Sequence, residues 1–244
     1  MHRRTRWARR LIKRSPLAGP ARVVRQGWLK VAYLFATPQE RRHSLSGPVG
    51  HPGIWKLKRY YQIWFLKQRR LQSHHHLLEL GCGTLRGGLP IIVFLQEGHY
   101  YGIDARGIAL EEARKELAES NLEEKHPTLI LAADLSSVDL DRTFDFVWAF
   151  SVLPHLEDQN VRGAFRCAKR HLAVNGRFLA TAGIGSRRRG RWMEFPDLVR
   201  PLEFYAREAS GEGLNVQDLG VLSSLGHPPD VINAHHHMLL FAAN

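Results

Sequence analysis

The feature that most constrains this chain is a short apolar run that ends in a glycine-rich turn. Leu77-Leu78-Glu79-Leu80 is followed by Gly81-Cys82-Gly83-Thr84-Leu85-Arg86-Gly87-Gly88 and then by a second apolar run, residues 89–95. This order predicts a buried strand, a tight turn and a helix. Gly81 and Gly83 carry no Cβ, so backbone N–H groups of the turn can approach a ligand at the helix N-terminus.

A carboxylate at the end of the next predicted strand supports a nucleotide-like ligand. Residues 99–104 form this strand. Asp104 lies about 20 residues beyond the turn, where nucleotide-binding α/β units place an acid on ribose hydroxyls. Gly87 comes one position too late for the dinucleotide fingerprint, and Glu79 precedes the turn. A carboxylate beside the turn disfavours a phosphate and suits a ligand that carries positive charge.

The rest of the chain alternates between helical and extended patterns. Helices are predicted over 54–72, 107–121 and 158–172, strands over 127–133, 144–150 and 177–182, and a closing antiparallel pair over 214–221 and 235–241. We therefore predict an α/β fold with a Rossmann-like, seven-stranded, mostly parallel sheet, helices on both faces and an N-terminal helical extension.

The stretch from Glu79 to Gly88 resembles the first motif of class I S-adenosylmethionine-dependent methyltransferases. Its Leu-Arg-Gly-Gly ending resembles a bacterial subgroup often associated with small-molecule or surface-glycan modification. The resemblance covers residues 50–244 and implies S-adenosyl-L-methionine as cofactor. The cofactor-binding residues that it implies are Glu79, Gly81, Cys82, Gly83, Asp104, Ala105, Asp134, Leu135 and Phe150.

Asp134 follows the third predicted strand. In the resembled family an acid at this point accepts a hydrogen bond from the adenine amino group, and the next backbone N–H, here of Leu135, contacts the ring. Standing alone, Asp134 would be interpreted as a helix cap or turn residue.

His155 is the candidate catalytic residue. It follows the fourth predicted strand, at the edge where open α/β sheets place their chemistry. Imidazole titrates near neutral pH and can take a hydroxyl proton as the methyl group moves. The alternative is that His155 caps the next helix or only shapes the cofactor pocket. Residues 151–156 also lack the Asn-Pro-Pro-Tyr type of sequence that amine-directed nucleic-acid methylases use there.

The candidate substrate-binding residues are aromatic or basic. Residues 187–192 form a basic cluster at the same edge of the sheet, and Arg187, Arg189 and Arg191 can clamp a phosphate, sulfate or carboxylate. The alternative is a mobile, solvated loop. Tyr61 lies in the helix that precedes the first strand, which covers the cofactor cleft in the resembled family.

The formal charge of +12 is unevenly distributed. Residues 1–76 hold eighteen Lys or Arg against one acid, whereas residues 77–244 hold seventeen against twenty-two. We divide the chain into a basic helical extension and linker, 1–50, and a methyltransferase domain, 51–244. Residues 1–36 combine basic and aromatic side chains, which suits an anionic membrane surface; a solvated arm or a helix packed on its own domain is the alternative.

Further patterns bear on the compartment. The chain shows no apolar run long enough for a signal peptide or a membrane span, and its two cysteines suit a reducing compartment. We expect a cytoplasmic protein, with the inner face of the membrane as a peripheral site. Consecutive side chains of His74, His75 and His76 point in different directions, so no metal is expected.

These observations predict an enzyme that methylates a small-molecule or sugar and glycan acceptor, with oxygen as the first choice of acceptor atom. The alternatives are an RNA methyltransferase, which the basic extension favours, and a non-catalytic cofactor-binding protein tethered by its basic arm.

Overall fold

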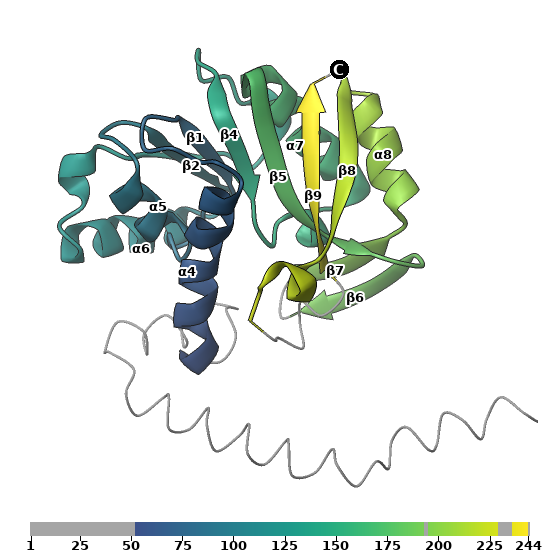
Figure 1. The fold of residues 1–244 in the computed structure, drawn as a ribbon, viewed down its shortest axis with the longest axis horizontal. Coiled ribbons are helices and arrows are strands. Elements are labelled where there is room, and N and C mark those ends of the chain that lie inside the picture. Colours follow the sequence, from purple (N-terminus) through teal and green to yellow (C-terminus); the bar gives the residue numbers. More distant parts are fainter. Residues whose placement is uncertain (1–51, 193–194, 229–235, 244) are drawn as a thin grey trace, which may run out of the picture. The chain divides into compact units, whose positions relative to one another are not determined.

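A twisted, mostly parallel sheet with helices on both faces forms the frame of the protein (Figure 1). The structure is a computed structural model that describes residues 52–192, 195–228 and 236–243. By its contacts the chain divides into two units, Met1–Leu57 and Lys58–Asn244, and the fold below is that of the second unit. The predicted helical extension over residues 1–50 lies outside the described residues.

The described residues contain nine strands in one sheet, with the order β3-β2-β1-β4-β5-β7-β6 and with β9 between β5 and β8. The strands are β1 (Leu77–Leu80), β2 (Tyr100–Asp104), β3 (Thr128–Leu131), β4 (Phe144–Ala149), β5 (Leu172–Ile184), β6 (Arg188–Trp192), β7 (Phe195–Arg200), β8 (Leu214–Val221) and β9 (His236–Ala243). The predicted mostly parallel sheet is confirmed, and so is the closing antiparallel pair, β8 and β9.

Helices connect the parallel strands and cover the two faces of the sheet. They are α4 (Pro52–Gln68), α5 (Gly88–Phe94), α6 (Gly107–Glu119), α7 (Asp158–His171) and α8 (Leu202–Ser210). Short 3₁₀ helices are η2 (Glu123–Lys125), η3 (Leu135–Ser137), η4 (Leu153–His155) and η5 (Leu222–Leu225). Among the described helices, none has both the length and the apolar character needed to cross a bilayer.

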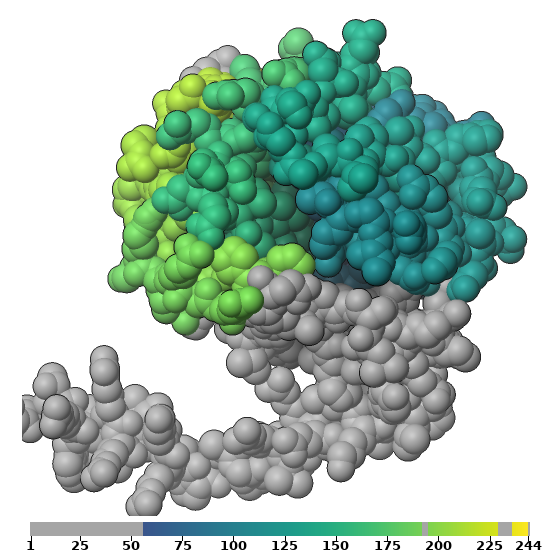
Figure 2. All heavy atoms as spheres, turned by 180° about the vertical axis from the view of Figure 1, so that it is seen from behind, coloured from purple at the N-terminus to yellow at the C-terminus, as the bar shows by residue number. Residues whose placement is uncertain are grey.

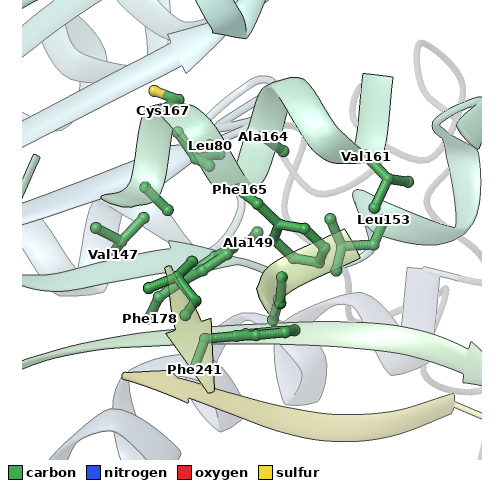
Figure 3. Close-up of a cluster of buried hydrophobic side chains, with 14 of the residues drawn as sticks. Leu80, Val147, Ala149, Leu153, Val161, Ala164, Phe165, Cys167, Phe178 and Phe241 are labelled. Atoms are coloured by element: carbon green, nitrogen blue, oxygen red, sulfur yellow. The ribbon is translucent and has the colours of Figure 1, made fainter. Parts of the chain in front are cut away.

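The two faces of the sheet bury separate hydrophobic clusters, because side chains alternate along each strand. In β4, Val147 and Ala149 face the cluster under α7 and α8, whereas Phe146 and Trp148 face the cluster under α4, α5 and α6. Phe165, Phe178 and Phe241 meet in the first cluster, with ring centroids 4.8 to 6.2 Å apart (Figure 3). The sheet is thereby held from both sides.

Two segments differ from the sequence prediction. The helix predicted over 54–72 ends at Gln68, because Arg70 adopts a left-handed conformation (φ 70°) and the N–H of Leu71 bonds the carbonyl of Leu66. The basic cluster 187–192, expected as a loop or clamp beyond the sheet, is largely strand β6, which pairs antiparallel with β7. This β6–β7 hairpin extends the sheet beyond β5 and raises the strand number above the predicted seven.

Candidate active site

The glycine turn after β1 has the backbone geometry that its sequence predicts. Gly81 and Gly83 both adopt positive φ angles, 70° and 55°. A Cβ on Gly81 would lie 2.5 Å from Cγ2 of Val152, so a side chain is excluded by contact as well as by conformation. Cys82 between them is buried and packs against Gly102 of β2, and burial raises the pKa of its thiol, which suits a packing role.

The glycine pair at the start of α5 makes room for neighbouring side chains. A Cβ on Gly87 would lie 2.3 Å from Oε1 of Gln62, and a Cβ on Gly88 would lie 2.6 Å from the hydroxyl of Tyr100. Gln62 in turn accepts a hydrogen bond from the indole N–H of Trp148 at 2.9 Å. The Leu-Arg-Gly-Gly ending of the motif therefore serves the packing of α4 and β2 against the turn.

Glu79 lies inside the protein beneath the turn. Its carboxyl accepts a 2.5 Å hydrogen bond from the hydroxyl of Tyr100, and both side chains are almost fully buried. Burial raises the pKa of Glu79 to about 8, although the bond from Tyr100 and the charge of Arg86 act in the opposite direction. Near neutral pH the group is therefore mostly protonated in this structure.

Asp104 connects the end of β2 to the glycine turn. Its Oδ2 accepts the N–H of Gly83 at 2.8 Å, and its Oδ1 accepts the N–H of Arg106 at 2.9 Å and the Nε of Arg106 at 3.4 Å. A carboxylate has about four acceptor positions, so Oδ2 keeps capacity for one more donor. Ala105, the next residue, is exposed at this edge of the sheet.

Asp134 has the capping geometry that its sequence position also allows. Its oxygens accept the N–H of Ser136 at 2.9 Å and the hydroxyl of Ser136 at 2.8 Å, which caps η3. These two bonds hold the pKa of Asp134 below its usual value. Leu135 is half-buried against the core. The predicted adenine contact of the two residues stays a prediction.

An aromatic cluster closes the carboxyl end of β4. Phe150 stacks on Trp148 and on His227, and Tyr61 from α4 meets the His227 ring edge-on at a centroid distance of 4.8 Å. All four side chains are buried. The hydroxyl of Tyr61 is buried with no hydrogen-bond partner among the described residues, which marks it as a group that a ligand can satisfy.

His155 lies at the same edge, on η4, and is anchored to the β6–β7 hairpin. Its Nδ1 lies 2.7 Å from the carbonyl oxygen of Pro196, and its ring centroid is 5.8 Å from that of Phe195. A carbonyl oxygen can only accept, so Nδ1 carries the proton and the neutral ring has its lone pair on Nε2. This tautomer is the one in which Nε2 acts as a base.

The three arginines predicted to bind substrate have different surroundings. Arg187 bonds Asp158, and Arg189 forms a two-point ion pair with Glu157 at 2.7 and 3.0 Å. Both carboxylates lie at the beginning of α7, so the β6–β7 hairpin is tied to that helix. Arg191 lines a separate cavity of about 220 Å³ with Arg189, Gly190 and Pro196.

The residues described above converge on the point where the strand order reverses. Connections leave β1 in one direction and β4 in the other, and such a switch point opens a crevice at the carboxyl ends of the strands. Figure 2 shows a hollow in the surface between the blue and the green parts of the chain. The glycine turn, Asp104 and Phe150 all lie at the ends of strands that border this point.

Sequence reasoning missed several residues of this region. Arg106 contacts Asp104, His227 stacks on Phe150, and Gln62 bonds the neighbouring Trp148, but nothing in their local sequence distinguishes them from surface residues. Their positions depend on tertiary packing. Among the described residues, no group of His, Cys, Asp and Glu side chains is arranged to hold a metal ion.

Comparison with known proteins identifies the type of domain that contains these residues. Residues 78–178 match the family model described as "Methyltransferase domain", and the match runs from β1 into β5. It includes the glycine turn, Asp104, Asp134 and His155. A search of curated proteins found no match.

Solved structures share the fold at low sequence identity. The glycopeptide N-methyltransferase MtfA has 16% identity and a TM-score of 0.62, over 77% of this chain and 96% of that one. Its complex with S-adenosyl-L-methionine has 16% identity and a TM-score of 0.59, over 77% and 94%. The CcbJ methyltransferase from Streptomyces caelestis has 14% identity and a TM-score of 0.58, over 76% and 90%.

Residues 78–178 thus match a methyltransferase domain, and the described residues share their Rossmann-like fold with methyltransferases of known structure. The family model agrees with the predicted class of enzyme, a methyltransferase, and the fold is shared with a methyltransferase solved together with S-adenosyl-L-methionine. The roles of the individual cofactor-binding and catalytic residues remain predictions.

Proposed function

We propose that this methyltransferase acts on a hydroxyl group of a small-molecule or sugar acceptor, with His155 as general base. The observation that supports this role is the hydrogen bond between Nδ1 of His155 and the Pro196 carbonyl. It favours the tautomer in which Nε2 accepts a proton, and it fixes the ring at the carboxyl edge of the sheet.

The described residues fit the cofactor. S-adenosylmethionine, when bound, supplies an electrophilic methyl group on a positively charged sulfur. Gly81 and Gly83 leave space for close backbone approach, and the remaining acceptor position on Oδ2 of Asp104 suits a hydroxyl donor. The orphaned hydroxyl of Tyr61 offers a further hydrogen bond within the same region. The main contribution of the chain is then to hold the acceptor in line and exclude water.

The nature of the acceptor rests on two arguments. The sequence after β4 lacks the amine-directed motif, and the β6–β7 hairpin places arginine-lined cavities beside η4. A nitrogen acceptor is the second candidate, because one protein of similar fold is a glycopeptide N-methyltransferase. A base at His155 serves both, since an ammonium group must also lose a proton before it accepts a methyl group.

The test is transfer from methyl-labelled S-adenosylmethionine to a bacterial lysate that is then separated into RNA, protein, lipid-linked glycan and small-metabolite pools. We expect label in the glycan or metabolite pool and a loss of about 10²–10⁴ in rate for His155→Ala. His74→Ala, an exposed histidine at the opposite edge of the sheet, is the matched control.

Three other results of this experiment would support a different function or a different base. Label in RNA would promote the RNA methyltransferase alternative, and its dependence on salt would then identify phosphate contacts. Cofactor binding without label in any pool would support a non-catalytic protein. An unchanged rate in His155→Ala would show that His155 is not the general base, and the proposed acceptor would be unaffected.

A further inference from the structure

The guanidinium of Arg106 lies in front of the glycine turn. Apart from its own chain neighbours, the described residues bring one heavy atom within 4 Å of a Cβ built on Gly83, and this atom is Nη2 of Arg106 at 3.9 Å. The missing Cβ leaves this space to a ligand that approaches the backbone of the turn, and the Arg106 side chain borders it.

Two contacts hold the Arg106 side chain at this place. Its Nε lies 3.4 Å from Oδ1 of Asp104, and its Cζ lies 5.3 Å from the ring centroid of Phe195. A guanidinium over an aromatic face is attracted by the negative charge of that face. Phe195 is the first residue of β7, and β1, β4 and β5 lie between β2 and β7 in the sheet. The contact therefore joins two distant parts of the fold.

Phe195 also packs against the proposed base. Its ring centroid is 5.8 Å from that of His155, and the carbonyl of the next residue, Pro196, accepts the bond from Nδ1 of His155. The Phe195 ring is thereby attached to the segment that follows β4, whereas Arg106 belongs to the segment that follows β2. Arg106 and Phe195 together cross the crevice in front of the glycine turn.

The Arg106 side chain can leave this position at little cost. It is 40% exposed, so water solvates its charge once it turns away from Phe195. The orientation of Asp104 does not depend on the guanidinium, because the backbone N–H groups of Gly83 and Arg106 donate to its two oxygens. The contact between Arg106 and Phe195 is thus one that can open without disturbing a buried network.

We propose that the contact between Arg106 and Phe195 is a gate, and that S-adenosylmethionine binds only after this contact has opened. A ligand that approaches Gly83 and the free acceptor position on Asp104 needs the space that the guanidinium borders. The closed state therefore competes with the ligand, and the measured affinity is reduced by the fraction of molecules that are open. This inference rests on the cofactor of the proposed function, but not on its acceptor or its base.

The experiment measures the association and dissociation rates of S-adenosylhomocysteine on the immobilised full chain by surface plasmon resonance. Phe195→Leu keeps an apolar side chain but removes the aromatic face. We expect its association rate to rise about two- to fivefold, with an unchanged dissociation rate and a Kd lowered by the same factor. Phe94→Leu removes the ring that Lys67 contacts at the end of α5, and this matched control should change neither rate.

A second variant tests the other side of the contact. Arg106→Gln keeps the backbone N–H and much of the side-chain length but loses the charge, so it should also raise the association rate. Because both substitutions open the same contact, the double variant should associate no faster than Arg106→Gln alone. Independent, additive increases in the association rate would overturn the gate.

Two further results would also overturn it. One is an association rate of Phe195→Leu equal to that of the wild type. The other is weaker binding through faster dissociation, because Phe195 would then contact the bound ligand. Failure of the wild type to bind S-adenosylhomocysteine would refute the cofactor of the proposed function and the gate together. Unchanged rates in Phe195→Leu and Arg106→Gln with intact binding would refute this inference alone.

Discussion

Glu79 is the least exposed carboxyl group of the described residues, and its surroundings make the stability of the fold depend on pH. Its pKa is about 8 in the folded protein, against an ordinary value of 4.5. Between these two pH values the folded state binds more protons than the unfolded state. The stabilisation is therefore present below the ordinary pKa and is lost as the pH rises toward the folded value.

We predict that Glu79→Gln makes the free energy of unfolding depend less on pH. Glutamine is uncharged and keeps an oxygen for the Tyr100 hydroxyl. In the wild type the group lowers the free energy of unfolding by up to about 1.4 kcal/mol for each pH unit between these limits. Urea unfolding of both proteins at pH 5, 6, 7 and 8 measures the difference in slope. The exposed Glu124→Gln is the control, and parallel curves for wild type and Glu79→Gln would contradict the prediction.

Tyr61→Phe tests whether the buried hydroxyl is there for a ligand. The hydroxyl has no hydrogen-bond partner among the described residues, and an unsatisfied buried donor costs about 1–3 kcal/mol. We expect the melting temperature of the ligand-free variant to equal or exceed that of the wild type, and the KM for the acceptor or the cofactor to rise several-fold. Tyr60→Phe, an exposed neighbour on α4, is the control. A lower melting temperature with an unchanged KM would place the hydroxyl in a structural role.

Residues differ in how far the sequence alone could predict them. Gly81, Gly83 and Asp104 were predictable because a turn and a strand end define their positions locally, and the structure gives them the expected backbone and contacts. Gln62 was not, because its hydrogen bond with Trp148 joins elements that are far apart in the sequence. Asp134 had two local interpretations, and the capping one is visible in the structure.

Among the elements, the β6–β7 hairpin shows why a charged segment was mistaken for a loop. β6 reads Arg-Arg-Gly-Arg-Trp, a composition that the sequence analysis assigned to solvent or to a ligand. Arg189 of β6 and Arg187 just before the strand each pair with a carboxylate at the start of α7. That complementarity joins residues about 30 positions apart in the chain, so no local pattern reveals it.

Asp158 is the carboxylate that joins the hairpin to α7. It accepts from Arg187 and from the buried Arg200; burial raises its pKa, but these bonds outweigh that effect and hold the pKa below its usual value. We predict that Asp158→Asn lowers the free energy of unfolding by about 1–3 kcal/mol, because Arg200 keeps its charge inside the protein without a counter-charge. The figure is below that for a fully buried pair, since half of the Asp158 side chain is exposed.

Chemical denaturation of Asp158→Asn at neutral pH measures this loss. Glu112→Gln breaks an exposed ion pair with Lys115 on α6 and should change the free energy of unfolding by no more than about 0.5 kcal/mol. The stabilisation from Asp158 should also vanish as the pH falls through its lowered pKa, because protonation removes the same charge. Equal stability of the two variants would show that the hairpin is held by its backbone pairing alone.

In the whole described domain, the central strands of the sheet are buried on both faces, whereas the edge strand β3 is partly exposed. β4 is buried along almost its full length and pairs with both β1 and β5, which also pairs with β9. β3 pairs with β2 in a parallel register and has intermediate or exposed side chains, with Leu131 61% exposed. The sequence predicted the strands of both regions equally well. It did not predict that β4 is more deeply buried than β3, because burial depends on which helices pack on each strand.

We therefore predict graded protection in native-state hydrogen exchange. Amides of β4 and of the part of β5 from 177 to 182 should exchange only through global unfolding, because opening them exposes both hydrophobic clusters. Amides of β3 should exchange through local opening with a smaller free energy and a weaker dependence on denaturant. Phe178→Ala, which removes about 3–5 kcal/mol from the centre, should then bring β4 and β5 toward the behaviour of β3 while leaving the local opening of β3 unchanged. If β3 and β4 exchange with the same free energy in the wild type, the domain opens as one cooperative unit and the division by cover is wrong.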